Sequence, residues 1–227
     1  MNKIIFATGN EGKMKEIRMI LSDLGVEVLS MKEAEISVDI VEDGKTFEEN
    51  ALIKARAAAA SGYIGVGDDS GLCVEALGGA PGVYSARYAG EHGDDEANLD
   101  LVLENMKGRT DRRAAFVCCI ACVFPDGSEP IVAHGRVDGE LLEARDGEGG
   151  FGYDPLFYYA PFAKSFAEIS REEKNEISHR GAAVRALAAK GEVDLAEFPL
   201  LMHVDEILSE KKAVNIPWES FTYTSFN

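Results

Sequence analysis

The chain has 227 residues, of which 46% are apolar and 28% charged, and it carries a formal net charge of −17. That length supports one large domain or two lobes around a sizeable core. The acidic balance disfavours nucleic acid and anionic membranes as partners, so a phosphate ligand would need local cations or a bound metal. No apolar run reaches the roughly 20 residues of a membrane span, and the first residues lack a signal-peptide pattern. We therefore expect a cytoplasmic protein.

The first predicted unit is a strand, a glycine-rich loop and a helix. Lys3 to Ala7 is a short apolar run, and apolar residues recur at helical spacing from Met14 onward. Between them lies Thr8 to Lys13, which would present backbone amides and a helix N-terminus to an anion. The loop is not a Walker A motif, because G-x-x-x-x-G-K-[ST] is absent. A plain turn between strand and helix is the alternative to phosphate binding.

An acidic segment and a capped helix come next. Val26 to Leu29 is a second predicted strand, and Glu33 to Lys45 is a polar, acidic loop. Thr46 and Glu49 have the spacing of a capping box, which predicts a helix from Phe47 to about Ser61. That helix carries Lys54, for which a solvated helix face is the simpler interpretation.

The central stretch contains two adjacent carboxylates. Two apolar runs, Tyr63 to Gly67 and Leu72 to Leu77, read as buried strands, with Asp68-Asp69-Ser70-Gly71 between them at a strand end. Side chains alternate along an extended segment, so Asp68 and Asp69 cannot both face one cleft. One of them is predicted to be a metal ligand or base and the other a structural partner. An Asp-Ser-Gly turn is the competing interpretation.

The middle of the chain predicts a helix and a hairpin. Asp94 to Lys107 has helical apolar spacing. Ala114 to Phe124 and Ile131 to Val137 are strand-like runs joined by a Pro-Asp-Gly turn. Their antiparallel pairing would make the sheet mixed, and the fold class is α/β.

The four cysteines, Cys73, Cys118, Cys119 and Cys122, lie in apolar runs, so we expect buried, reduced thiols. Cys119 and Cys122 form a C-x-x-C, but no second pair or nearby histidine completes a zinc site. On a strand those two side chains would also point to opposite faces.

The last motifs combine aromatic, glycine and basic residues. Gly147 to Gly152 matches G-x-G-x-x-G, but Pro155 and aromatics follow where a dinucleotide motif needs a helix. Phe151 suits a base-stacking pocket or an aromatic core strand equally well. Ser170 opens a capping box, and Ser178 could cap a helix through Ala189.

Basic residues lie near the start of the two helices that Ser170 and Ser178 are predicted to cap. Lys174 lies on the first predicted helix, and His179 and Arg180 lie in the first turn of the second. That end of a helix is unfavourable for cations, which suggests that His179 and Arg180 serve something other than helix stability.

Five stretches in this order resemble the inosine/xanthosine triphosphate pyrophosphatases, which are house-cleaning nucleoside triphosphate hydrolases. They are ATGNEGK at 7–13, TFEENALIKA at 46–55, the segment 68–90, GFGYDPLF at 150–157 and SREEKNEISHRG at 170–181. The resemblance covers the chain to about residue 190, the predicted domain 1–190. It says nothing of residues 191–227, an extension with apolar periodicity from Leu195 to Leu208, which we expect to dock on the same domain.

The resemblance implies an elongated fold of two lobes around a long mixed sheet, with the nucleotide in the cleft between them. It also implies a homodimer, Mg²⁺ dependence, and hydrolysis of ITP, dITP, XTP or dXTP to the monophosphate and pyrophosphate. Asp69 would bind metal and accept a proton, and Glu42 would be a second metal ligand, although Asp43 is an alternative.

The remaining site residues follow from the same motifs. The resemblance assigns phosphate contacts to Thr8, Gly9, Asn10, Glu11, Gly12, Lys13 and Lys54. It assigns contacts to the rest of the substrate to Ser70, Phe151, Gly152, Tyr153, Asp154, Lys174, His179 and Arg180. Two other functions stay open: a related pyrophosphatase acting on other bases, and a non-catalytic nucleotide-binding regulator.

Overall fold

The structure is a computed structural model that describes residues 3–21 and 27–190. Its centre is a seven-stranded sheet in the order β2-β1-β3-β4-β5-β6-β7. β1 pairs in parallel with β2 and β3, and the remaining neighbours are antiparallel, so the predicted mixed sheet is confirmed. The strands are β1 (Lys3–Phe6), β2 (Glu27–Ser30), β3 (Ile64–Val74), β4 (Arg113–Val123), β5 (Ile131–Leu141), β6 (Phe157–Tyr159) and β7 (Lys164–Ser165).

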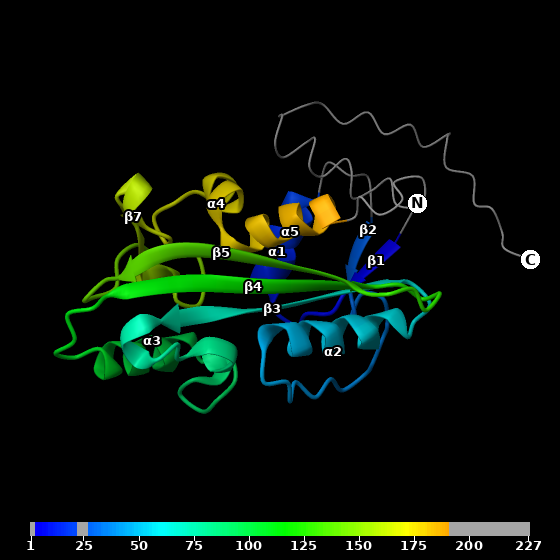
Figure 1. The fold of residues 1–227 in the computed structure, drawn as a ribbon, viewed down its shortest axis with the longest axis horizontal. Helices are drawn as coiled ribbons and strands as arrows, with labels where there is room; N and C mark the ends of the chain where they lie inside the picture. The colour runs from blue at the N-terminus through cyan, green and yellow to red at the C-terminus, as the bar shows by residue number, and fades with distance from the viewer. Residues whose placement is uncertain (1–2, 22–26, 191–227) are drawn as a thin grey trace, which may run out of the picture.

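Helices cover both faces of this sheet (Figure 1). α2 (Phe47–Ala59) and α3 (Asp95–Asn105) lie on one side, and α1 (Glu11–Ile20), α4 (Arg171–Ile177) and α5 (His179–Lys190) lie on the other. The capping boxes predicted before α2 and α4 are both formed, and Ser178 Oγ accepts a hydrogen bond from the amide of Gly181 at 3.1 Å. The α/β class with flanking helices is thus confirmed.

The central stretch was predicted as two strands, and this is wrong. β3 is one strand from Ile64 to Val74, and ten of its residues, 65–74, pair with β4. Gly65 and Gly67, which resemble the glycines that end a strand, instead lie within β3 and allow α2 to pack closely against it. A Cβ at Gly65 would lie 2.2 Å from the carbonyl oxygen of Ala55, and one at Gly67 would lie 2.4 Å from that of Ala51. The end of the second run, Glu75–Leu77, is a 3₁₀ turn.

Among the described residues, the end of β1 leaves part of the edge of β3 without a neighbouring strand. The β1–β3 ladder stops at Phe6 and Val66, while β3 continues. A 3₁₀ segment, η3 (Gly82–Arg87), covers the same edge further along, where Ser85 Oγ accepts from the Leu72 amide at 2.9 Å. The stretch of β3 between these contacts carries Asp68, Asp69 and Ser70, so side chains from both faces of the sheet can reach one opening.

The core has two main apolar clusters along the sheet. One joins β1 with the buried faces of α1 and α5, and the other joins the far ends of β3–β5 with α3 and β6. Cys122 lies in the first, whereas Cys119 packs with alanines of α2, which confirms that the two thiols face opposite sides. All four cysteines are free, and only Cys73 departs from the expected burial, because it is half-buried.

Residues 191–227, with the apolar periodicity from Leu195 to Leu208, lie outside the described residues. In the part of the chain that is described, no helix is long and apolar enough to cross a membrane.

Candidate active site

A cavity of about 850 Å³ opens at the uncovered edge of β3. It is bounded by the loop between β1 and α1, by α2, by η3 and by the first turns of α4 and α5. It brings together most of the residues predicted from sequence: Thr8, Gly9, Asn10, Lys13, Glu42, Lys54, Asp69, Ser70, Phe151, Gly152, Tyr153, Asp154, Lys174, His179 and Arg180.

Two residues of the predicted phosphate loop do not line the cavity. Glu11 is exposed on the first turn of α1. Gly12 lies behind the loop, where an added Cβ would stand 3.1 Å from the ring of Phe151. Gly12 therefore supports the aromatic wall by close packing rather than by facing the cavity.

The loop between β1 and α1 is held in shape by its own polar side chains. Asn10 is the N-cap of α1, and its Oδ1 accepts from the Lys13 amide at 3.0 Å. The Asn10 amide in turn donates to Thr8 Oγ1 at 3.1 Å. The loop thus reaches the cavity as a formed helix N-terminus, the type of site that binds anions.

Asp68 points to the α1 and α5 side of the sheet and is fully buried. Lys13 Nζ lies 3.0 Å and Arg180 Nε 3.5 Å from its Oδ2. Burial alone would raise the pKa of this carboxyl, but the charges of Lys13, Arg180 and Lys54 together outweigh it and hold the pKa well below its usual range. Asp68 is therefore a permanent counter-charge to two cations.

Asp69 points to the opposite face, toward α2, as strand alternation predicted. Its Oδ2 accepts from Asn50 Nδ2 at 3.1 Å, and its Oδ1 lies 3.3 Å from Lys54 Nζ. Burial raises the pKa of Asp69, and the neighbouring Lys54 and Lys13 only partly offset that effect. A carboxylate whose pKa is raised is a better proton acceptor than an ordinary one.

Lys54 joins Asp69 to the acidic loop. Its Nζ lies 2.8 Å from Glu42 Oε2 and is almost fully buried, so a solvated helix face is not its setting. Burial would lower the pKa of Lys54, but Asp68, Asp69 and Glu42 raise it, and the lysine stays charged.

A further part of the cavity lining combines an aromatic ring with buried charges. Lys174 Nζ lies 2.6 Å from Asp154 Oδ2 and 4.7 Å from the centre of the Phe151 ring. Asp154 Oδ2 also accepts from the Phe151 amide at 2.8 Å, which fixes the ring beside the ammonium. Burial raises the pKa of Asp154 although Lys174 opposes it.

His179 and Arg180 begin α5, where two cations would be unfavourable, and the structure explains how both are accommodated. Burial and the nearby charges of Arg180 and Lys174 lower the pKa of His179 well below its ordinary value, so the imidazole is neutral. It stacks on Phe116 with ring centres 4.9 Å apart. Arg180 is paired with Glu16 and donates to Ser70 Oγ at 3.1 Å.

The sequence profile of the Ham1 family matches residues 4–190. The chain belongs to the Ham1 family. It is 50% identical over 196 residues to the dITP/XTP pyrophosphatase of Clostridium perfringens, a match that covers 82% of this chain and 96% of that protein. It is 45% identical over 210 residues to the dITP/XTP pyrophosphatase of Desulfotalea psychrophila, covering 92% and 91%.

Solved structures agree with this assignment. The Ham1 protein of Staphylococcus aureus has a TM-score of 0.75 at 45% identity, covering 84% of this chain and 98% of that one. The HAM1 protein of Coxiella burnetii has a TM-score of 0.74 at 37% identity, covering 92% and 100%. The family resemblance drawn from the five sequence stretches is therefore confirmed.

Two carboxylates of this Ham1 protein converge in a way that fits a hard divalent cation. Glu42 and Asp69 both line the cavity and both reach one positive charge, Lys54 Nζ. Mg²⁺ is usually held by one or two carboxylates together with substrate phosphates. Asp43, the alternative ligand, is exposed and does not line the cavity, so the geometry favours Glu42.

Sequence reasoning missed Glu16 and Asn50. Glu16 lies on the buried face of α1 and pairs with both Lys174 and Arg180. The available signal was its position: it shares the helix face of Met14, Ile17 and Ile20, where a charge needs a buried partner. Asn50 gave no such signal, because an asparagine in a polar turn of a predicted helix does not by itself indicate burial or a functional contact.

Proposed function

We propose that this Ham1 protein hydrolyses deaminated purine nucleoside triphosphates, namely ITP, dITP, XTP and dXTP, to the monophosphate and pyrophosphate. The observation that carries the proposal is one cavity with a cationic end, a carboxylate pair and an aromatic end. The Clostridium and Desulfotalea relatives, which match most of this chain, are named dITP/XTP pyrophosphatases. The protein is then a hydrolase of phosphoric anhydrides.

Local cations let an acidic protein bind a polyanion. Lys13 and the helix N-terminus behind Asn10 would contact the phosphates, and Lys54 faces them from α2. Lys54 stays protonated because Asp68, Asp69 and Glu42 raise its pKa, and Lys13 Nζ lies 3.0 Å from Asp68 Oδ2. These local positive charges therefore offset the repulsion between a protein with a net charge of −17 and the phosphates of the substrate.

Asp69 would accept the proton of the attacking water. The new bond joins that water's oxygen to the α-phosphorus, the bond between the α-phosphorus and the bridging oxygen breaks, and pyrophosphate leaves with the electron pair. Mg²⁺ held by Asp69 and Glu42 would supply charge neutralisation at the phosphates and a more acidic bound water. Asn50 and Lys54 keep the Asp69 carboxylate in place.

The base would stack on Phe151 among donors. Lys174 and Arg180 line the cavity beside Phe151, and their N–H groups can donate to the 6-keto oxygen of hypoxanthine or xanthine. Adenine presents an amino group there, and a donor facing a donor costs about 1–3 kcal/mol in a dry pocket. GTP carries the 6-keto group and would be refused at its 2-amino group instead.

The assembly proposed with this function is a homodimer of elongated, two-lobed subunits, with the nucleotide lying between the lobes. The two apolar clusters along the sheet support two lobes within residues 3–190. Light scattering after size exclusion would test the dimer, and a monomer at micromolar concentration would contradict it.

A pyrophosphate-release assay across ITP, dITP, XTP, dUTP, GTP and ATP tests the function. We expect the deaminated purines to lead by orders of magnitude in kcat/KM. Preference for a pyrimidine would indicate a related pyrophosphatase, and tight binding without pyrophosphate release would indicate a regulator. Equal use of ATP and ITP would overturn the substrate assignment.

A further inference from the structure

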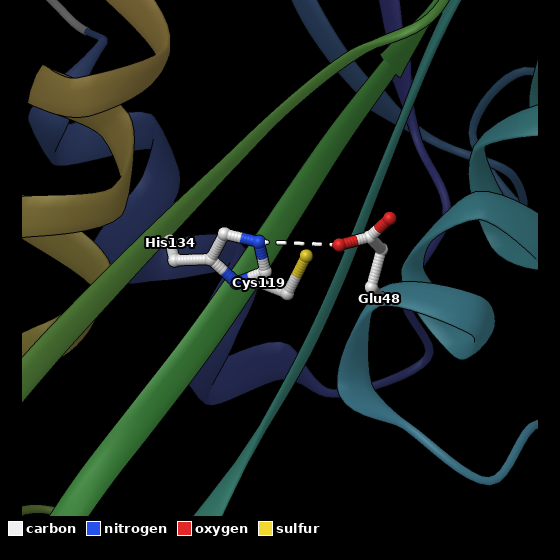
Figure 2. Close-up of side chains that lie close together, drawn as sticks. All are labelled: Glu48, Cys119 and His134. Carbon is white, nitrogen blue, oxygen red and sulfur yellow. Dashed lines mark ion pairs between the residues drawn. The ribbon is translucent and has the colours of Figure 1, made fainter.

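A second group of possible metal ligands lies outside the cavity. Glu48, Cys119 and His134 each offer one ligand atom, and these atoms lie within 4.8 Å of one another. Sequence reasoning found no histidine near the C-x-x-C, but sheet register places His134 directly across from Cys119. Figure 2 shows the Cys119 sulfur between the imidazole of His134 and the carboxylate of Glu48.

Three different elements converge here. Glu48 comes from the first turn of α2, Cys119 from β4 and His134 from β5. His134 Nε2 lies 3.2 Å from Glu48 Oε2, and both side chains are about half exposed, at 53% and 50%, whereas Cys119 is buried beneath them. The thiol therefore forms the floor of the group, and the other two form a rim that solvent reaches.

We propose that Glu48, Cys119 and His134 form a Zn²⁺ site on the α2 face of the sheet, with water as the fourth ligand. Sulfur, imidazole nitrogen and carboxylate oxygen are the donors that zinc takes, whereas magnesium takes oxygen. Bond lengths of about 2.0–2.3 Å in a tetrahedron place ligand atoms about 3.3–3.8 Å apart. The observed nitrogen–oxygen separation is close to that range, and the rim side chains are exposed enough to close on an ion.

The thiol must lose its proton to bind. Burial and the Glu48 carboxylate raise the pKa of Cys119 to about 12, so the metal-free site holds a neutral thiol that packs well beneath α2. Zinc binding would displace that proton and become tighter as pH rises.

The position of the site gives it a structural role. Cys119 is the cross-strand neighbour of Asp69, on the same face of the sheet. Glu48 opens the helix that carries Asn50 and Lys54, the two side chains that hold Asp69. An ion here would join the start of α2 to β4 and β5.

Cobalt titration tests the site, because a cobalt–thiolate bond gives a near-ultraviolet charge-transfer band that oxygen ligands do not. The full chain would be titrated with Co²⁺ and then Zn²⁺ in saturating Mg²⁺, so that the oxygen-rich cavity is already filled. We expect one equivalent of Co²⁺ to produce the band and Zn²⁺ to abolish it. Absence of the band in the wild type would overturn the proposal.

Matched variants assign the ligands. Cys122→Ser is the control, since Cys122 lies on the same strand and faces the opposite cluster, and it should keep the band. Cys119→Ser should lose the band. His134→Ala should weaken Co²⁺ binding at least about 100-fold, since even supporting residues around a metal are worth about 10–100-fold.

Thermal unfolding gives a second readout that does not depend on the band. Zn²⁺ should raise the Tm of the wild type and of Cys122→Ser, because the ion binds the folded state. His134 is a half-exposed side chain, so His134→Ala should fold normally and show no such rise. An equal rise in His134→Ala, or a band that persists in Cys119→Ser, would place the ion elsewhere.

Discussion

Two adjacent carboxylates, Asp68 and Asp69, project from opposite faces of β3 into different surroundings. Asp68 is fully buried against Lys13 and Arg180, which hold its pKa below the ordinary value. Asp69 faces Asn50 and Lys54 at the cavity wall, and burial raises its pKa. The same type of side chain therefore has two settings at adjacent positions: Asp68 is a fixed counter-charge on one face, and Asp69 on the other face is the proton acceptor that we propose.

The difference follows from what each face of the strand contains. On the Asp68 side, α5 brings a guanidinium that cannot lose its charge, and the carboxylate must stay ionised to balance it. On the Asp69 side the cations are fewer and the carboxylate reaches the cavity. We therefore expect the stability of the fold to depend on Asp68 and the rate of turnover to depend on Asp69.

The largest effect expected is from metal removal, which should abolish turnover and leave the fold intact. Glu42 and Asp69 would lose the cation that we propose they hold, while the Asp68 face would be unaffected. Pyrophosphate release measured in excess chelator, then after Mg²⁺ is restored, checks this. Undiminished activity in chelator would show that the carboxylate pair does not work through a metal.

Asp69→Asn should reduce kcat by about 10²–10⁴-fold, the usual contribution of a general base. The change is nearly isosteric, so we expect a wild-type circular dichroism spectrum. A folded variant that retains more than about a tenth of wild-type turnover would mean that Asp69 is not the base.

Asp68→Asn should lower the free energy of unfolding by about 3–5 kcal/mol, the usual loss when one partner of a buried ion pair is removed. It leaves Lys13 and Arg180 without their shared carboxylate. Denaturant unfolding at neutral pH measures the loss, with Asp69→Asn as the matched control. The division between the two carboxylates fails if Asp69→Asn is the more destabilising change.

Arg180→Ala should narrow the preference for ITP over ATP by roughly five- to 150-fold, which corresponds to about 1–3 kcal/mol for one polar match. Ratios of kcat/KM for ITP, XTP, GTP and ATP measure this. Because Arg180 also neutralises Asp68 and Glu16, Arg180→Lys is the second variant: it keeps the charge and loses the planar fork. An unchanged ratio in both variants would remove Arg180 from base recognition.

The smallest effect expected is a pair of opposite pH dependences in metal-free protein. The pKa of Asp68 is lowered by folding, so its contribution to stability is present above its ordinary value of 3.8 and lost as pH falls below that value. The pKa of Asp69 is raised, so its contribution is present below 3.8 and lost as pH rises through the folded value.

The two variants report these dependences separately. As pH rises toward about 3.8, Asp68→Asn should lose stability relative to wild type, and as pH rises from about 3.8 toward neutrality, Asp69→Asn should gain it. Unfolding free energies of each variant relative to wild type, measured across both windows, would show slopes of opposite sign. Slopes of the same sign would mean that the two faces do not differ electrostatically as described.

Most elements of this fold could be predicted from local patterns. The capping box at Thr46, the strand–loop–helix unit around Lys13 and the hairpin of β4 and β5 all formed as expected. The division of β3 into two strands was wrong, because glycines that resemble breaks were needed for close packing against α2. Glycine is typical both of a strand end and of a strand position packed closely against a helix, and only the neighbouring element distinguishes the two.

The sequence by itself determined the helices, the β4–β5 hairpin, the alternation of Asp68 and Asp69 and the motifs of the cavity. These depend on a residue and its near neighbours: caps, periodicity and side-chain direction. Only the tertiary structure decided which charges pair across the chain, as Glu16 does with Arg180, and which residues register across strands, as Cys119 does with His134. Those contacts join positions far apart in the chain, and burial and sheet register select them only when the whole fold forms.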